Sequence, residues 1–215
     1  MGVRVIELAG LAPTPFCGMM LADLGANVVR VDRTTSVGST DMLSRHKRSI
    51  QIDLKSADGK DALRRLLSRA DVLLEGYRPG VLESLGMSPD VLLQINPRLV
   101  IARLSGFGQT GPLSLVAGHD LNYAGISGVL DFVGPAHQAP VFPTNLLADF
   151  AGGSFLCTLG IVSALLHRER TGCGQVVDSG MADGANYLNS FSLTGRSSIF
   201  AGPRGTNLLD GGGTL

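Results

Sequence analysis

The stretch VRVIELAGLAPTPFCGMMLADLGANVVRVDR, residues 3–33, decides the fold. Residues 3–8, VRVIEL, have the length and the branched apolar residues of a short buried strand, and the prolines in the turn that follows suit the entrance of a helix over residues 16–24. Gly25 is placed to end that helix, and the β-branched residues at 27–31 predict a second strand. A strand, a helix and a strand in this order begin a doubly wound α/β fold.

The same alternation continues along the chain. Further strands are expected at residues 49–54, 71–74, 99–104 and 175–179, and helices at 56–69, 81–95, 155–168 and 181–187. Gly86 should divide the helical segment 81–95 in two, and Asp149 should open a glycine-rich turn ahead of the helix at 155–168. The predicted fold class is therefore α/β, with a doubly wound, Rossmann-like and mostly parallel sheet.

Composition excludes several classes of protein. A chain of 215 residues with 44% hydrophobic and 17% charged residues has the make-up of a globular protein with a sizeable core. A net charge of zero gives no basic field for nucleic acid, and no apolar run in the sequence reaches the roughly 18 residues of a membrane span. Three cysteines without CxxC spacing indicate reduced thiols in an intracellular protein and no zinc site. We expect a soluble, intracellular protein that binds no metal, nucleic acid or membrane.

An acidic residue after the second strand raises the alternative of a dinucleotide-binding domain, which holds a ribose with such a residue. That alternative needs a GxGxxG turn after the first strand, and residues 9–18, AGLAPTPFCG, lack it. Asp32 is therefore expected to be a strand-end or turn residue.

Basic residues gather in the polar, non-periodic segment 33–49, RTTSVGSTDMLSRHKRS. Arg33, Arg45, Lys47 and Arg48 form either a solvated charge cluster or a loop that grips phosphate oxygens. Arg78 lies in EGYRPG, residues 75–80, directly after a predicted strand. Because open parallel sheets bind ligands at the carboxyl ends of their strands, Arg78 is a candidate ligand contact, with a salt bridge or turn contact as the alternative.

Two groups capable of proton transfer stand in glycine-rich surroundings. His119 lies in GHDLNY, residues 118–123, and Asp149 lies in NLLADFAGG, residues 145–153. A histidine and a carboxylate can exchange a proton with an activated carbon near neutral pH when their surroundings adjust their pKa values. Taken singly, His119 is equally a capping or loop histidine and Asp149 a helix N-cap. The glycines around them permit close approach of the backbone to a ligand, which favours a site.

Four motifs carry a resemblance to a known family. AGHDLNY (117–123), NLLADFAGG (145–153), ARLSGFGQTGP (102–112) and PRGTNLLDGG (203–212) resemble the class III CoA-transferase family, and within it the racemases. The resemblance covers this whole chain but only the N-terminal part of the family's proteins. It implies that residues 1–205 are the N-terminal part of the large, CoA-binding domain of that fold, truncated, and that residues 206–215 begin a linker to a smaller domain.

The resemblance also implies an activity: inversion of the 2-methyl centre of branched-chain acyl-CoA thioesters, as in fatty acid and bile acid intermediate metabolism. His119 and Asp149 would exchange the α-proton from opposite faces of the carbon, through an enolate held by backbone N–H groups near Gly152 and Gly153 or by a helix N-terminus. No cofactor is implied, because the thioester acidifies the α-carbon and coenzyme A is part of the substrate. Substrate contacts are expected from Arg33, Arg45, Lys47, Arg48, Leu54, Lys55, Arg78, Gly118, Asp120 and Tyr123.

Two alternatives stay open. One is a CoA-transferase of the same family, in which Asp149 would be a nucleophile that forms an aspartyl-CoA anhydride. His119 speaks against it, because a histidine in the GHD motif is typical of the family's racemases. The other is an inactive fragment that binds CoA or forms dimers. The resemblance further implies an interlocked homodimer for the full-length form, and a peroxisomal or mitochondrial location in a eukaryote or a cytoplasmic one in a bacterium.

Overall fold

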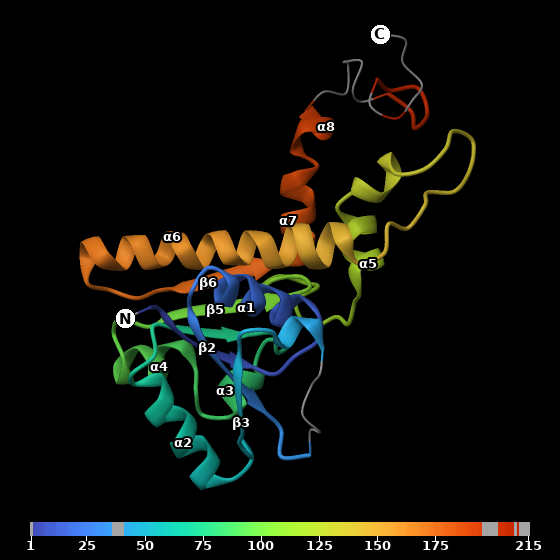
Figure 1. Ribbon diagram of the computed structural model, residues 1–215. Coiled ribbons are helices and arrows are strands. Elements are labelled where there is room, and N and C mark those ends of the chain that lie inside the picture. Colours follow the sequence, from blue (N-terminus) through green and yellow to red (C-terminus); the bar gives the residue numbers. More distant parts are fainter. Residues whose placement is uncertain (1, 36–40, 195–201, 209, 211–215) are drawn as a thin grey trace.

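The computed structural model describes residues 2–35, 41–194, 202–208 and 210, and within them six strands form one sheet (Figure 1). The strand order is β3-β2-β1-β4-β5-β6, and all five pairings are parallel. This order is that of a doubly wound Rossmann-type sheet, which confirms the predicted fold class. The strands are β1 (Arg4–Leu8), β2 (Asn27–Asp32), β3 (Arg48–Gln51), β4 (Val72–Glu75), β5 (Val100–Ser105) and β6 (Val176–Gly180). Only β3 departs from its predicted range by more than one residue, because it ends at Gln51.

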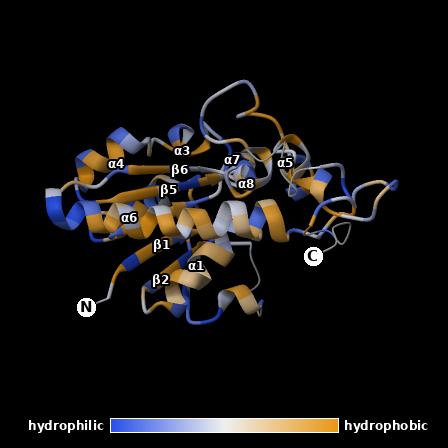
Figure 2. Cartoon of the chain, turned by 90° about the horizontal axis from the view of Figure 1, so that it is seen from above, coloured by the Kyte–Doolittle hydropathy of each residue, from blue (hydrophilic) through white to orange (hydrophobic). Residues whose placement is uncertain are grey.

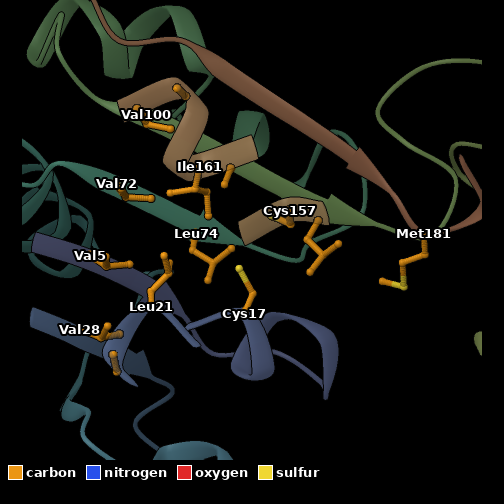
Figure 3. Packing of buried hydrophobic residues seen from close by; sticks show 14 of the residues in the cluster. Val5, Cys17, Leu21, Val28, Val72, Leu74, Val100, Cys157, Ile161 and Met181 are labelled. Atoms are coloured by element: carbon orange, nitrogen blue, oxygen red, sulfur yellow. The ribbon is translucent and has the colours of Figure 1, made fainter. Parts of the chain in front are cut away.

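Helices cover both faces of the sheet. One face carries α1 (Pro13–Asp23), α6 (Leu156–Thr171) and α7 (Met181–Leu188), and the other carries α2 (Ala57–Leu67), α3 (Val81–Ser84) and α4 (Pro89–Ile95). Each face has its own apolar core. In the first core, Cys157 and Ile161 of α6 lie over the strand residues Val72 and Leu74 and beside Cys17 of α1 (Figure 3). Strands buried on both faces explain the nearly continuous apolar runs in the sequence.

Helix ends follow the capping signals of the sequence. Ser56 caps α2 by accepting a hydrogen bond from the Gly59 N–H at 3.0 Å. Gly25 and Gly172, which follow α1 and α6, have φ of 92° and 79°, the left-handed conformation that glycine adopts without strain. The first helix begins at Pro13, three residues before the predicted start.

The segment before α6 differs from the prediction. Residues Leu146–Phe155 form a π-helix, η3, that continues directly into α6, so Asp149 lies in its first turn and not at a glycine-rich turn. Gly152 of η3 and Gly184 of α7 let the two helices touch backbone to backbone, and a Cβ on Gly184 would collide with the Gly152 carbonyl. The glycines therefore serve helix packing.

Together η3 and α6 span Leu146–Thr171, 26 residues that are long and apolar enough to cross a membrane by length and composition. The core helix of a soluble protein passes the same test. Here Cys157, Ile161 and Ala164 are buried in the core above the sheet, as expected for such a core helix.

Several short elements extend to one side of the sheet (Figure 1). They are α5 (Asp120–Ile126), the 3-10 turn η2 (Val129–Phe132) and α8 (Ser190–Thr194); another 3-10 turn, η1 (Met42–Ser44), precedes β3. Residues 206–208 and 210 are described as turns, and the rest of the predicted linker lies outside the described residues. The predicted domain boundary at residue 205 stays a prediction.

Candidate functional site

Two adjoining cavities lie where the strands end. The sheet order reverses between β1 and β4, and the crevice beyond the carboxyl ends of such strands is where doubly wound folds bind ligands. The larger cavity has a volume of about 620 Å³ and the smaller one about 270 Å³. Tyr77 and Arg78, in the loop after β4, line both. Arg78 therefore occupies the junction between the two cavities.

The smaller cavity brings together the two predicted proton-transfer groups. His119 precedes α5, Asp149 lies in the first turn of η3, and both line this cavity, although 30 residues separate them in the chain. Gly118 and Tyr123, two of the predicted substrate contacts, line it as well. The Tyr123 ring packs so closely on Gly118 that a Cβ there would lie 2.6 Å from it, which explains the glycine before the histidine.

The Asp149 carboxyl has an unusual acidity. Its pKa is raised from the ordinary value of 3.8 to about 6, chiefly by burial and next by the negative charge of Asp120, while His119 opposes the shift. Burial likewise raises the pKa of the Tyr123 hydroxyl, with the Asp149 charge as the second cause. A carboxyl with a pKa of about 6 can both take and return a proton near neutral pH.

Asp120 is predicted to contact substrate, but its side chain lies away from the smaller cavity. Its side chain is buried, with 2% exposure for the residue, and it does not line the smaller cavity. Its Oδ2 accepts hydrogen bonds from the backbone N–H groups of Ala148 and Asp149 at 2.9 and 2.8 Å. The Asp120 side chain therefore contacts the backbone of η3, and its predicted contact with substrate stays a prediction.

The larger cavity collects four predicted CoA contacts. Arg33 follows β2, Leu54 and Lys55 follow β3, and Arg78 follows β4, so all four come from the carboxyl ends of neighbouring strands. The rest of the wall is mixed. Apolar side chains form one part of it, and polar ones, including two carboxylates, form another: Ala9, Val31, Ile52, Val81 and Leu85, and Asp32, Thr34, Thr35, Asp53 and Tyr77. The basic groups suit the anionic part of a ligand, and the apolar part of the wall suits a flat apolar group.

Three other basic residues do not line either cavity. Lys47 is buried, with 2% exposure of its side chain, and its Nζ lies 2.6 Å from Glu7 Oε2 and 2.8 Å from the Pro15 carbonyl oxygen. Arg45 pairs with Asp23, and Arg48 donates to Asn27 Oδ1 at 2.7 Å. These contacts pair Lys47 with Glu7 inside the fold and give Arg45 and Arg48 other partners, so a role of these three residues in phosphate binding stays a prediction.

The expected enolate donors are also elsewhere. Gly152 and Gly153 are buried against α7 and line neither cavity, so the prediction that their N–H groups face the substrate is wrong. The other predicted kind of donor, a helix N-terminus, is present: α5 begins at Asp120, directly after the cavity-lining pair Gly118 and His119.

The sequence analysis did not predict the buried charged residues that hold the loop after β4 in place. Glu75 Oε2 accepts the Tyr77 N–H at 2.7 Å, and Glu75 Oε1 accepts from Arg103 Nε at 2.7 Å. Arg103 also donates to Glu83 of α3 at 2.7 Å. Glu75 and Arg103 are buried charged residues inside otherwise apolar strands, and this pattern could have revealed them in the sequence.

Within the described part of the chain, no group of three or more His, Cys, Asp or Glu side chains is placed to hold a metal ion. Cys17, Cys157 and Cys173 are free.

The fold and the cavities define an α/β domain with its ligand site at the carboxyl edge of a parallel sheet. The chain belongs to CoA-transferase family III, whose model matches residues 1–208. It is 58% identical to alpha-methylacyl-CoA racemase of Mus musculus and 54% identical to that of Homo sapiens, each over 98% of this chain and 55% and 56% of the relative. A CAIB/BAIF family protein from Brucella suis has a similar structure, with a TM-score of 0.84, 31% identity, and coverage of 94% of this chain and 58% of that one. The chain thus spans about half the length of the curated relatives it matches.

Proposed function

We propose that the protein is an isomerase that inverts the 2-methyl centre of branched-chain acyl-CoA thioesters by exchange of the α-proton. The observation that carries the proposal is the placement of His119 and Asp149 on one small cavity that joins a larger, basic-rimmed one. The similarity to two alpha-methylacyl-CoA racemases supports the same activity.

The chemistry needs two groups and one activated carbon. One group, in its basic form, takes the α-proton, and the bonding electrons move onto the thioester oxygen as an enolate. The other group, in its protonated form, returns a proton to the opposite face of the carbon. Inversion follows because the two faces of the enolate meet different donors. In the reverse direction His119 and Asp149 exchange these roles, and we propose that no cofactor is required.

The larger cavity has the matching role of holding the CoA part. Arg33, Lys55 and Arg78 carry the positive charge for phosphate groups, and the apolar wall contacts the adenine. We assign the stabilisation of the enolate oxygen to the N-terminus of α5, which begins directly after the cavity-lining residues Gly118 and His119. We further propose that the protein works as a homodimer, in peroxisomes or mitochondria of a eukaryote or the cytoplasm of a bacterium.

The test is incubation with a single enantiomer of a 2-methylacyl-CoA in deuterated water, with mass spectrometry for deuterium at the α-carbon. His119→Ala and Asp149→Ala should each slow exchange by at least about 10²-fold, the low end for acid–base groups. His167→Ala changes an exposed histidine on α6 and should leave the rate unchanged. Full exchange in the double variant His119→Ala, Asp149→Ala would refute the proposal.

The transferase alternative predicts a different intermediate. In a transferase, Asp149 would become covalently attached to an acyl group and then to CoA, and hydroxylamine would trap it as a hydroxamate. We expect no trapped adduct on Asp149, because His119 faces the same cavity and supplies the second proton-transfer group that a racemase needs. A hydroxamate at Asp149 during turnover would favour the transferase.

A further inference from the structure

The first turn of η3 is fixed by a side chain from another helix. Asn145, which stands in the N-cap position of η3, makes no capping hydrogen bond with its side chain. The Asp120 carboxylate does so instead, by accepting the N–H groups of Ala148 and Asp149. The first N–H groups of a helix lack partners within it, and a buried carboxylate beside them is favoured by hydrogen bonding and by the helix dipole.

Asp120 also follows His119 directly in the chain. The backbone N–H of His119 donates to Asn122 Oδ1 at 3.0 Å, which fixes the histidine at the start of α5. The dipeptide His119-Asp120 thus carries one proton-transfer group and holds the backbone of the other. This short path links the two groups directly, in addition to the long segment 127–145 that joins the helices and the packing of η3 on α7.

The charge of Asp120 acts on Asp149 as well. Asp120 Oδ1 is buried and has no hydrogen-bond partner among the described residues, so little else offsets its charge. The other charged or titratable groups on the wall around Asp149 are His119 and Tyr123 of α5 and Tyr77 and Arg78 of the loop after β4. The helices α1 and α7, which also pack on η3, bring Pro13, Thr14 and Met181 to this wall, and none of these carries a charge.

We propose that Asp120 is a positioning residue that holds Asp149 on the cavity wall that it shares with His119 and, together with burial, disfavours its ionised form. The proposal rests on the function proposed above. It assigns two separable effects to one carboxylate: the hydrogen bonds fix the position of Asp149, and the negative charge disfavours ionised Asp149.

The variant Asp120→Asn separates the two effects, because the amide oxygen can still accept both N–H groups but carries no charge. When Asp149 acts as the base, exchange rises with pH as Asp149 loses its proton. We expect this limb of the pH profile to move to lower pH by at least about half a unit in Asp120→Asn, since a neighbouring like charge commonly raises a carboxyl pKa. Asp120→Glu keeps the charge but displaces the carboxylate oxygen that accepts the two N–H groups. The rising limb of the pH profile should therefore stay at the same pH, while turnover should fall about 10-fold or more because Asp149 is misplaced.

Asp178→Asn is the matched control, because Asp178 also accepts a backbone N–H, that of Gln109 at 3.0 Å, but lies outside both cavities. Asp178→Asn should change neither the position of the rising limb of the pH profile nor the turnover. A readout that needs no activity is the titration of the Asp149 carboxyl carbon by NMR, assigned through Asp149→Asn.

An unchanged Asp149 titration in folded Asp120→Asn would overturn the electrostatic part, and unchanged turnover in Asp120→Glu would overturn the positional part. If Asp120→Asn does not fold, the turnover of Asp120→Glu still decides whether Asp120 positions Asp149. If the wild-type protein shows no α-proton exchange but Asp149 titrates lower in Asp120→Asn, the proposed function fails and the role of Asp120 stands.

Discussion

Lys47 shows how a residue in a polar segment can belong to the interior. The segment 33–49 has the composition of a solvated loop, yet the Lys47 ammonium lies against Glu7, in the middle of β1. Burial raises the Glu7 pKa to about 7 despite the attraction of Lys47, and burial lowers the Lys47 pKa. Sequence patterns cannot pair residues 40 positions apart, but a glutamate inside an apolar strand indicates that a partner is needed.

Replacement of Lys47 by alanine should destabilise the protein strongly. The change leaves the buried Glu7 without its ion-pair partner, and removal of one partner of a buried pair costs about 3–5 kcal/mol. Urea unfolding at pH 8 measures this free energy. Lys55→Ala, at an exposed lysine beside the larger cavity, should stay within about 0.5 kcal/mol. Unchanged stability of Lys47→Ala together with weaker acyl-CoA binding would restore the phosphate role.

Asp149 should make the stability of the protein depend on pH. Its pKa rises from 3.8 when unfolded to about 6 when folded, so its contribution to stability is fully present below pH 3.8 and is lost as pH rises through about 6. Asp149→Asn cannot ionise. We therefore expect its melting temperature to exceed that of the wild type at pH 8 and to equal it near pH 4. A lower melting temperature at pH 8 would contradict the raised pKa.

The elements of the sheet were predictable because each carries its own signal. The apolar runs of β1, β2, β4, β5 and β6 and the capping residues Ser56 and Gly25 act within a few residues of the chain. No local signal predicted the π-helix η3, and its backbone contact with α7 joins residues more than 30 positions apart in the chain. His119 and Asp149 were recognised from the family motifs, whereas the buried contacts of Lys47 and Asp120 depend on tertiary pairing.

The contact between η3 and α7 gives a prediction at the scale of two helices. Gly184→Ala places a Cβ against the Gly152 carbonyl and should destabilise the protein by about 1–3 kcal/mol, the usual cost of overpacking. Gly125→Ala is the control within α5, where a Cβ would meet nothing within 4 Å. It should stabilise by up to about 1 kcal/mol, because alanine favours a helix over glycine. Chemical denaturation measures the free energy of unfolding of both variants. An equal change in the two variants would show that η3 and α7 can move apart to make room for the added Cβ.

Over the whole molecule, α6 presents a second apolar face. Its buried face points to the sheet, and on the outward side Leu159, Val162 and Leu166, with Phe155 at the end of η3, recur at helical spacing and are exposed, Leu159 to 61% (Figure 2). Exposed apolar surface of this kind favours association. We expect residues 1–215, made alone, to show a mass that rises with concentration in light scattering.

The double variant Leu159→Glu, Leu166→Glu should lower that mass, because charges on the outward face oppose burial. Arg65→Glu, on an exposed position of α2, changes charge away from this face and should leave the mass unchanged. A monodisperse monomer at all concentrations for the original chain would contradict the prediction.

The continuity of η3 and α6 has a geometric consequence for Asp149. Ile161 is locked in the core and stands twelve residues after Asp149 on the same helical rod (161 − 149 = 12). In an ordinary α-helix each side chain points about 100° further around the helix axis than the one before it. In the wider π-helix this angle per residue is smaller. The direction in which the Asp149 side chain points from the helix axis therefore depends on the helical rotation summed over the residues between Asp149 and Ile161. A change from π- to α-helical winding anywhere between them would swing the carboxylate around the rod and away from His119, while the sheet and its core stayed where they are.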